Sequence, residues 1–501
     1  MHNVLSPISR LHPELLLCIL KEVMNYSSNN DAVLLFTWIC RHWRCTVLDT
    51  PLLWNEIRTT NTDFLQECIS RSRHVPLTFR IHVAEPGYPD PIPTVLRCLP
   101  RTQRLHLSGD SVGTGVWPEE DINLWKRPAP LLKFLKVSGF AFPATLFSGC
   151  APTLQTLHLT KCAFDPENFP PLPELRSLSI IDAPYGIPVW SVLDMLQTLP
   201  HLHSLVIRES LREEAFDQKL RLLPELRQLS LQSEVFGIVH EILTHITIPA
   251  TAKIRIWVDQ LKDTVEDEDN LRIVNAMLGC RVPSEMTIRS LHILSYEEGH
   301  EYSIIERNKE GEHVSIRVRF DGDTDMDIIE DILSILDLDD LEVLKVTDQY
   351  DNLIPSNEFW LPFCGLKNLQ TVKLCTGFAT NFVVHLFLAH RPLWDIVLPR
   401  SDPDLVLDGC EELAAATLSF KYIRTLVLEH FVESPQLDSL TSILGAVLRV
   451  RLFLNRRLGK LTVHGLAPME EQEVSDLEYV VGKFTYHPLV RSEDDQDTAT
   501  S

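Results

Sequence analysis

The hexamer LRSLSI at residues 175–180 decides the fold, because its apolar pattern, L-x-x-L-x-L, returns along most of the chain. Two further copies of the pattern read LQTLHL at 154–159 and LRQLSL at 226–231. β-Branched residues replace leucine in some copies, which suits a strand. The other copies lie at 104–107, 131–137, 202–207, 288–293, 341–346, 369–374, 393–398, 423–428 and 458–463, with weaker ones at 253–256 and 316–320.

The middle apolar residues of these copies form a ladder with steps of 21 to 37 residues. That spacing is close to the 20–29-residue period of leucine-rich repeats, stretched at a few loops. Stacked repeats of this kind bury one continuous core and leave a row of short parallel strands on the concave side. The ladder runs Leu105, Leu135, Leu157, Leu178, Leu205, Leu229, Ile254, Leu291, Val318, Leu344, Val372, Ile396, Leu426 and Leu461.

The sequence therefore predicts an α/β fold, with an irregular leucine-rich-repeat solenoid after a small helical N-terminal module. Helices and loops are expected on the convex side of the solenoid. Only Cys162 occupies the Asn/Cys position that follows the strand in regular repeats, so we expect the repeats to be uneven. A set of ordinary α/β domains is the alternative, since these also alternate strands and helices.

The first 60 residues read as short helices. After Pro13, which suits a first helical turn, apolar residues recur at Leu16, Ile19, Leu20 and Val23 with helical spacing. A polar stretch at 25–31 ends this helix. A second helix is expected from about 36 to 48, because Pro51 disfavours a helical residue before it. Its apolar stripe is Phe36, Ile39, Cys40, Trp43 and Val47.

Three motifs in this region resemble an F-box. They are I-x-x-L-x-P-E-L-L-x-x-I at 8–19, ICRHWR at 39–44 and TPLLW at 50–54. The segment 64–79 resembles the stretch that follows the F-box in proteins of mushroom-forming (basidiomycete) fungi. His12 departs from the pattern, which usually has proline there, while Pro13 and Glu14 remain in place.

The resemblance implies a partner, a Skp-type adaptor, which links F-box proteins to a cullin scaffold and a RING ligase. The rest of such a chain selects the protein to be ubiquitinated. Carried over by position, the implied adaptor contacts are Leu11, Pro13, Glu14, Leu15, Leu16, Ile19, Leu20, Ile39, Cys40, Trp43, Leu53 and Trp54. Some of these must hold the helices together, and Trp43 and Trp54 suit the core best.

We accordingly divide the chain into four parts. Residues 1–60 are the F-box, 61–94 a connecting segment and 95–465 the repeat region. Residues 466–501 form an acidic tail whose last residues, SEDDQDTATS, are typical of disorder.

Composition restricts the class of protein. The chain has 46 Lys and Arg against 69 Asp and Glu, which gives a formal charge of −23. This charge disfavours general binding to nucleic acids and binding to anionic membranes. We expect no secretory leader, because the first residues, MHNVLSPISR, lack a basic stretch followed by an apolar one. No apolar run approaches the roughly 18–20 residues that span a bilayer. The 11 cysteines form no CxxC pair, which indicates reduced thiols. A cytoplasmic or nuclear protein that acts on other proteins is expected.

The predicted concave face has the opposite charge. In each strand, the residues at positions −1, +1 and +3 relative to the middle apolar residue should point to that face. Acidic residues there are Asp321, Asp395 and Glu429. The hypothesis is that this face selects an acidic or phosphorylated segment of a substrate protein. Its basic residues are Arg104, Lys136, Arg208, Lys253, Arg255, Arg317, Arg319, Lys345, Lys373 and Lys460.

No motif predicts catalysis, a cofactor or a metal. GxSxG, GxxxxGK[ST] and GxGxxG are absent. His240 and His245 are one residue too far apart for a zinc-binding HExxH helix. His201 and His203 are expected on one strand face without a third ligand.

The sequence thus favours a non-enzymatic substrate-recognition subunit of a Skp–cullin–F-box ubiquitin ligase. The alternative is a leucine-rich-repeat binding scaffold that acts outside a ligase.

Overall fold

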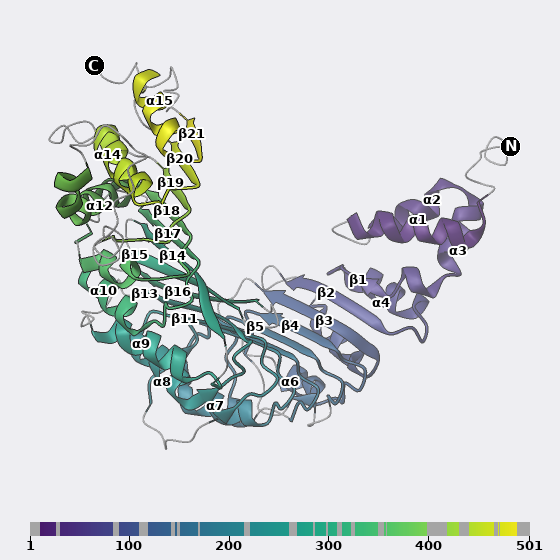
Figure 1. Ribbon diagram of the computed structural model, residues 1–501. Helices are drawn as coiled ribbons and strands as arrows, with labels where there is room; N and C mark the ends of the chain where they lie inside the picture. The colour runs from purple at the N-terminus through teal and green to yellow at the C-terminus, as the bar shows by residue number, and fades with distance from the viewer. Residues whose placement is uncertain are drawn as a thin grey trace, which may run out of the picture. The chain divides into compact units, whose positions relative to one another are not determined.

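The computed structural model separates the chain into two units (Figure 1). The first comprises residues 1–233 with 237–252, and the second 234–236 with 253–501. Each unit is described by itself. The structure describes residues 11–26, 31–83, 90–109, 119–141, 146–147, 151–168, 171–214, 221–259, 268–283, 286–296, 299–307, 313–321, 326–348, 355–356, 358–397, 418–429, 440–464, 469 and 471–487.

Short helices open the first unit. They are α1 (Pro13–Tyr26), α2 (Asp31–Ile39), α3 (Arg41–Leu48) and, after a 3-10 turn, α4 (Thr62–Arg71). The single helix expected around residues 36–48 is wrong, because Cys40 is extended, at φ −161° and ψ 170°, and separates α2 from α3. Asn61 caps α4, since its side chain accepts a hydrogen bond from the Phe64 amide.

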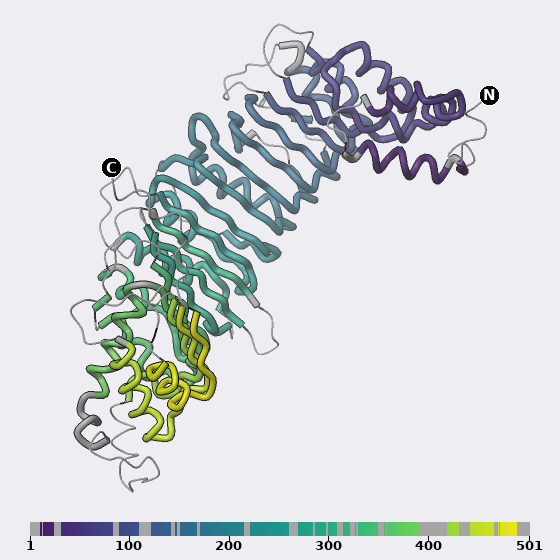
Figure 2. Tube along the Cα trace, turned by 90° about the horizontal axis from the view of Figure 1, so that it is seen from above, coloured from purple at the N-terminus to yellow at the C-terminus, as the bar shows by residue number. Residues whose placement is uncertain are grey.

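A parallel sheet follows, and its core positions confirm the sequence ladder. Leu105, Leu135, Leu157, Leu178, Leu205 and Leu229 pair residue by residue across neighbouring strands, and all are buried. Figure 2 shows these strands side by side. The sheet begins at Glu56, and its second strand lies within 61–94. In spatial order its strands are β1 (Glu56–Ile57), β2 (Leu77–Val83), β3 (Thr102–Gly109), β4 (Phe134–Ser138), β5 (Thr156–Thr160), β6 (Ser177–Ile181), β8 (Ser204–Arg208) and β11 (Gln228–Ser233).

Each of the strands β4, β5, β6 and β8 ends in a left-handed residue: Gly139, Lys161, Asp182 and Glu209, at φ 84°, 52°, 54° and 41°. The amide of each donates to a carbonyl of the next strand, so the ladder continues through the turn. Cys162 follows the second of these turns; it is buried, and its thiol donates to the Val137 carbonyl at 3.3 Å. In a simple βα unit a helix follows the strand, whereas here a hydrogen-bonded turn follows each of these strands.

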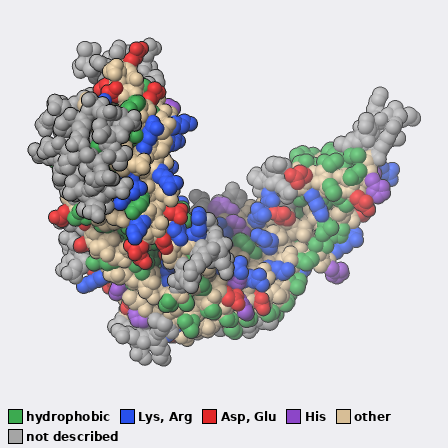
Figure 3. Space-filling model, viewed as in Figure 1, with side chains coloured by type: hydrophobic (Ala, Val, Ile, Leu, Met, Phe, Trp, Pro, Cys, Tyr) green, Lys and Arg blue, Asp and Glu red, His purple; other side chains and the backbone are tan. Residues whose placement is uncertain are grey.

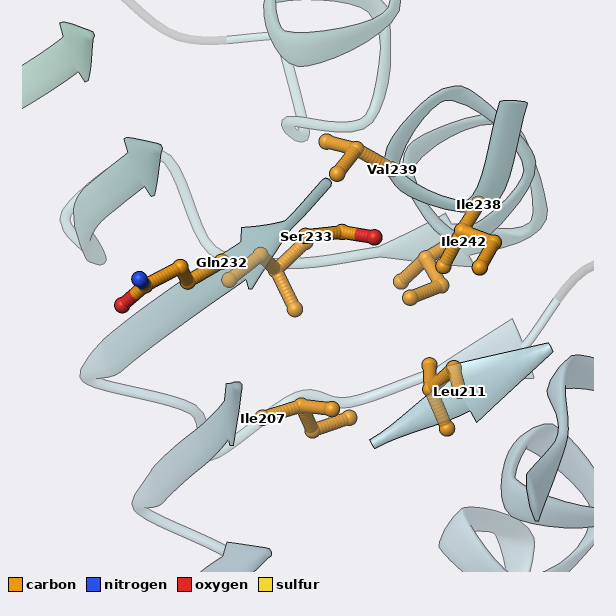
Figure 4. Close-up of a pocket in the computed structure, with 8 residues that line it drawn as sticks. Ile207, Leu211, Gln232, Ser233, Ile238, Val239 and Ile242 are labelled. Atoms are coloured by element: carbon orange, nitrogen blue, oxygen red, sulfur yellow. The ribbon is translucent and has the colours of Figure 1, made fainter. Parts of the chain in front are cut away.

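Helices and short paired segments cover the buried face of this sheet. Between β8, β9, β11 and α8 lies a cavity of about 10 Å³, with Ile207, Leu211 and Ile242 around it, while the Gln232 amide points away (Figure 4). Such a volume is at the limit for one water molecule, and its apolar lining makes it a packing void. The covering elements are α5 (Ile92–Arg97), α6 (Glu119–Trp125), α7 (Val189–Gln197), α8 (Phe236–His245) and the pairs β7 (Ile187–Pro188) with β9 (Leu211–Arg212) and β10 (Arg221–Leu222) with β12 (Ile246–Thr247).

The second unit has a mixed sheet. An additional strand, β15 (Gly299–Arg307), lies antiparallel between β14 (Thr287–Tyr296) and β16 (His313–Asp321), which corrects the expectation of parallel strands alone. The sequence ladder is also wrong at one step, because Ile254 pairs with Ile316 and not with Val318. The remaining strands are parallel: β13 (Lys253–Asp259) beside β16, then β17 (Val343–Asp348), β18 (Thr371–Cys375), β19 (Thr425–Glu429), β20 (Lys460–His464) and β21 (Lys483–His487) after β14.

Helices follow most strands of this unit. The strand expected at 393–398 is wrong, because those residues up to Val397 belong to α12 (Thr376–Val397). Leu393, Ile396 and Val397 have helical spacing as well as the repeat pattern, so the hexamer alone did not distinguish the two. The other helices are α9 (Glu268–Gly279), α10 (Met326–Ile335), α11 (Leu361–Cys364), α14 (Leu440–Phe453) and α15 (Glu471–Val480).

One buried histidine makes the stability of the second unit sensitive to pH. His390 on α12 is fully buried and neither ring nitrogen has a hydrogen-bond partner among the described residues. Burial, with the nearby Arg451 and His385, lowers the pKa of His390 to about 3. The unfolded chain takes up this proton below about pH 6.5 while the native chain does not, so stability falls as the pH falls.

We predict that His390→Leu will flatten this pH dependence. Between pH 7 and pH 5 the wild-type chain should lose about 2 kcal/mol more free energy of unfolding than the variant, since one pKa unit is worth about 1.4 kcal/mol. Urea unfolding of the second unit at both pH values measures the difference. Equal losses in the two proteins would contradict a neutral buried imidazole.

Candidate functional site

Helices α1 and α2 expose large apolar side chains on one side. On α1, Leu15, Ile19 and Val23 follow one another at four-residue spacing and are 56%, 42% and 44% exposed. On α2, Trp38 is 69% exposed and lies one turn from Leu35, next to Ile39. Figure 3 shows hydrophobic side chains gathered over these helices. We call Leu15, Ile19, Val23, Leu35, Trp38 and Ile39 the apolar helix face.

Each of the two helices packs into the core with its opposite side, and the described residues leave the apolar helix face uncovered. Leu16 and Leu20 of α1 and Val33 and Phe36 of α2 are buried, so each helix already has one side in the core. A helix that is apolar all round is normally buried. An uncovered patch of this kind marks an interaction site in soluble proteins.

The predicted adaptor residues divide by burial. Trp43 packs edge-on against Phe36, and the Trp54 indole donates to the Val47 carbonyl at 2.9 Å, so both tryptophans hold the core. Pro13 begins α1, but its side chain lies outside the described residues. The buried residues are Leu16, Leu20, Trp43, Leu53 and Trp54; the half-buried ones are Leu11 and Cys40; the exposed ones are Glu14, Leu15, Ile19 and Ile39.

Three residues of the apolar helix face were missed from the sequence: Val23, Leu35 and Trp38. The signal was present, because Leu35, Trp38 and Ile39 stand at i, i+3 and i+4. The break at Cys40 turns this second stripe away from the one that Phe36 and Trp43 share.

A hollow of about 280 Å³ adjoins Trp38. Its wall includes Arg71, whose guanidinium lies over the Trp54 ring at 5.0 Å and pairs with Glu67. Arg44, also in the wall, donates to the Thr37 carbonyl at 2.8 Å. The hollow beside Trp38 is large enough to hold a side chain of another protein.

A second candidate surface crosses the sheet of the second unit, on the face turned away from its buried core. Strand pairing places residues of six neighbouring strands, β13 to β18, at one level. At a strand separation of about 4.8 Å, the line extends over roughly 24 Å. We call it the basic row; in spatial order it consists of Arg255, Arg317, Ser303, His292, Lys345 and Lys373.

The basic row carries positive charge without compensation. None of its Arg or Lys side chains forms an ion pair with a carboxylate of the described residues, and Figure 3 shows Lys and Arg over the strands of this unit. Burial first, and then Lys345 and Arg317, lower the pKa of His292 to about 4. His292 is therefore neutral at pH 7, and its ring lies 3.2 Å from the Thr347 hydroxyl.

Aromatic rings border the basic row. The Arg319 guanidinium lies 4.3 Å from the Trp257 ring and 4.4 Å from the Tyr296 ring. This stacking orders Arg319 one level away from Arg317, beside Glu301 of the neighbouring strand. Lys253 is exposed at the start of β13, and Lys460 lies at the start of β20 next to Lys483.

The other predicted basic residues lie on the first unit. Lys136 is level with His106 and His158 of the adjoining strands, and it is a cause, after burial, of the lowered pKa of both histidines. Arg104 lies over the Phe134 ring at 4.4 Å. Arg208, at the end of β8, is exposed. The predicted acidic residue Asp395 lies on α12, off the sheet.

Some titratable side chains lie close enough together to suggest catalysis or metal binding. The Cys364 thiol lies 3.6 Å from His385, but burial raises the pKa of Cys364, which works against a nucleophile. His201 and His203 precede β8 in a turn, not on the strand as expected, and both face Glu225, at 3.1 and 3.9 Å. Across the described ranges, no three His, Cys, Asp or Glu side chains come together as metal ligands.

Comparisons with known proteins add little. No family model and no curated protein matches the chain. Among solved structures it is similar to the crystal structure of a TLR13–ssRNA13 complex, at a TM-score of 0.30 and 12% identity. That similarity covers 86% of this chain and 49% of the other, so the chain spans about half the length of that protein. None of the helices within the described residues has the length and apolar character to cross a membrane. The strand register and the repeated turns themselves make this an α/β fold with a leucine-rich-repeat-like region.

Proposed function

We propose that this chain is the substrate-recognition subunit of a Skp–cullin–F-box type ubiquitin ligase. The apolar helix face carries the proposal, because it lies within the residues whose motifs resemble an F-box. An adaptor that covers these six side chains removes them from water, at about 25 cal/mol for each Å² of apolar surface. Trp38 is the natural anchor, since tryptophan dominates binding energy at interfaces.

In this proposal the chain contributes proximity and no chemistry. The sheets supply the surface on which a substrate protein binds, and the basic row favours a substrate segment with negative charge. Arg104, Lys136 and Arg208 form a separate basic surface on the first unit, which also favours a segment with negative charge.

Purification of the tagged chain from its own cells, with the proteasome blocked, tests the proposal. Recovery of a Skp-type adaptor together with a cullin, identified by mass spectrometry, supports it. An adaptor without a cullin favours a repeat scaffold that works outside a ligase. If neither protein is recovered, the F-box assignment fails.

Reversing charge on the basic row should weaken substrate binding. We predict that Arg317→Glu with Lys345→Glu will lower the affinity for an acidic or phosphorylated substrate segment by at least tenfold, because two attractive contacts become repulsive. Both side chains point away from the core, so the fold is kept. Fluorescence anisotropy with a labelled substrate peptide, or capture of the substrate protein, measures the loss.

A control variant separates the basic row from net charge. Arg176→Glu with Arg227→Glu alters the charge equally at exposed turns of the first unit. This variant should bind the segment within about twofold of wild type. An equal loss in both variants would instead point to attraction by overall charge.

A further inference from the structure

A second basic site lies in the second unit, at the turns that lead into its strands. A hollow of about 180 Å³ is bounded by three such turns: the one before β18, the one before β19 and the one between α14 and β20. We call it the basic hollow. Its charged and aromatic lining consists of Lys367, Lys421, Tyr422, Arg424, Arg456 and Arg457.

The charge of the basic hollow has no counterpart in its lining. Five cations surround it, and its other lining residues are neutral. None of the five forms an ion pair with a carboxylate among the described residues, although the chain as a whole carries 69 Asp and Glu. Cations held together in this way repel one another, and a bound anion relieves that repulsion.

The fold holds three of these cations in place. The Arg457 guanidinium donates to the carbonyls of Tyr479 and Val481, at 3.0 and 2.5 Å. The Arg456 guanidinium lies 6.0 Å from the Tyr422 ring, and the Lys421 ammonium lies 5.7 Å from the same ring. The site is therefore partly ordered before any ligand binds, which lowers the cost of binding.

Helix polarity accounts for only part of the cluster. Asn455 ends α14 in the left-handed region, at φ 54°, and the amide of Arg456 donates to the Arg451 carbonyl at 2.8 Å. The carbonyl end of a helix favours cations, which suits Arg456 and Arg457. Lys367, Lys421 and Arg424 belong to other turns, so the end of α14 does not explain why they lie at the hollow.

We propose that the basic hollow binds a small free anion with two or more phosphate groups. Arginine recognises phosphate through paired N–H donors, and lysine adds point charges from other directions. The volume is below the 300–1,000 Å³ of ordinary small-molecule pockets, which suits a compact anion. Bound there, it joins the turns of three successive repeats and stabilises the second unit. This site is separate from the basic row and from the proposed adaptor surface.

Inorganic pyrophosphate is the probe for the full-length chain. Calorimetric titration should give saturable binding, and thermal unfolding should show a Tm that rises with pyrophosphate but not with sulfate at equal ionic strength. Lys421→Ala with Arg424→Ala should weaken binding at least tenfold. Lys345→Ala with Lys373→Ala removes the same charge from the basic row and should leave the affinity within twofold.

Any one of these results would overturn the proposal: no saturable binding, equal stabilisation by sulfate, or equal losses in both variants. Tighter binding of a phosphoserine peptide than of pyrophosphate, lost in the Lys421 and Arg424 variant, would assign the hollow to a phosphorylated protein and reject the small anion. Neither the adaptor nor a substrate takes part in these experiments, so their outcome leaves the proposed function untouched.

Discussion

Replacing Trp38 by Ala together with Ile19 by Glu will abolish recovery of the Skp-type adaptor. Trp38 offers the largest exposed apolar side chain on α2, and Ile19 lies in the middle of the α1 stripe. Interface anchors of this type are worth about 2 kcal/mol or more each, and 1.4 kcal/mol is tenfold in affinity. The pair should therefore weaken adaptor binding by on the order of several hundred-fold, as measured with purified adaptor by biolayer interferometry.

Both substitutions lie on exposed positions, so loss of binding should occur without loss of the fold. The matched control is Tyr185→Ala with Leu222→Ala, since these side chains are 68% and 70% exposed on other elements of the same unit. The control should bind the adaptor as wild type does. A Trp38 and Ile19 variant that keeps its Tm and still binds adaptor within threefold would remove the apolar helix face from the interface.

Breaking a buried ion pair will have the largest effect on stability. Glu306 on the antiparallel strand β15 accepts two hydrogen bonds from Arg281, one at 2.8 Å and one at 2.5 Å. Both side chains are less than a tenth exposed. Glu306→Ala leaves the guanidinium buried without this partner, which costs about 3–5 kcal/mol. Urea unfolding, with hydrogen exchange of the β14–β16 amides, measures the loss.

Two further variants show whether the cost comes from the orphaned charge. Arg281→Met with Glu306→Leu removes both charges, and it should recover most of the lost stability. Asp476→Ala breaks the half-exposed pair with Arg449 and should change stability by less than about 1 kcal/mol. A Glu306→Ala loss no greater than that of Asp476→Ala would show that the Arg281 pair is not a stabilising anchor of β15.

The register of the first unit followed directly from the sequence. Leu135, Leu157 and Leu178 lie on neighbouring strands at the same level, as the spacing of their hexamers predicted. The reason is local: each strand is preceded by a short turn whose two apolar residues, such as Leu172 and Leu175, are both buried. A pattern that includes its own turn fixes the register without distant information.

The second unit departed from the ladder where pairing depends on distant residues. β15 reads GHEYSIIER, which contains no leucine hexamer, so it was not predicted. Its antiparallel insertion sets β16 against β13 two residues away from the expected alignment. That shift matters for function, because it brings Arg317 level with Arg255. The ladder had predicted that Arg317 would be level with Lys253.

The candidate adaptor surface could be predicted in part. The three motifs located the region within the first 60 residues. The extended residue Cys40 separates α2 from α3, so Trp38 and Trp43 belong to different helices. The spacing of Leu35, Trp38 and Ile39 marks a second apolar stripe, but no periodicity marks the break at Cys40, and so Trp38 was not predicted as an adaptor contact.

Along each strand, residues that stabilise the fold alternate with residues that face a possible ligand. Leu344 and Val372 hold the second unit together, while their neighbours Lys345 and Lys373 lie half-buried on the opposite face of the sheet. A mutation at a lysine of this kind changes what the surface recognises at almost no cost to folding, whereas one at its neighbour does the reverse. The specificity of the surface can therefore change one residue at a time while the melting temperature stays the same.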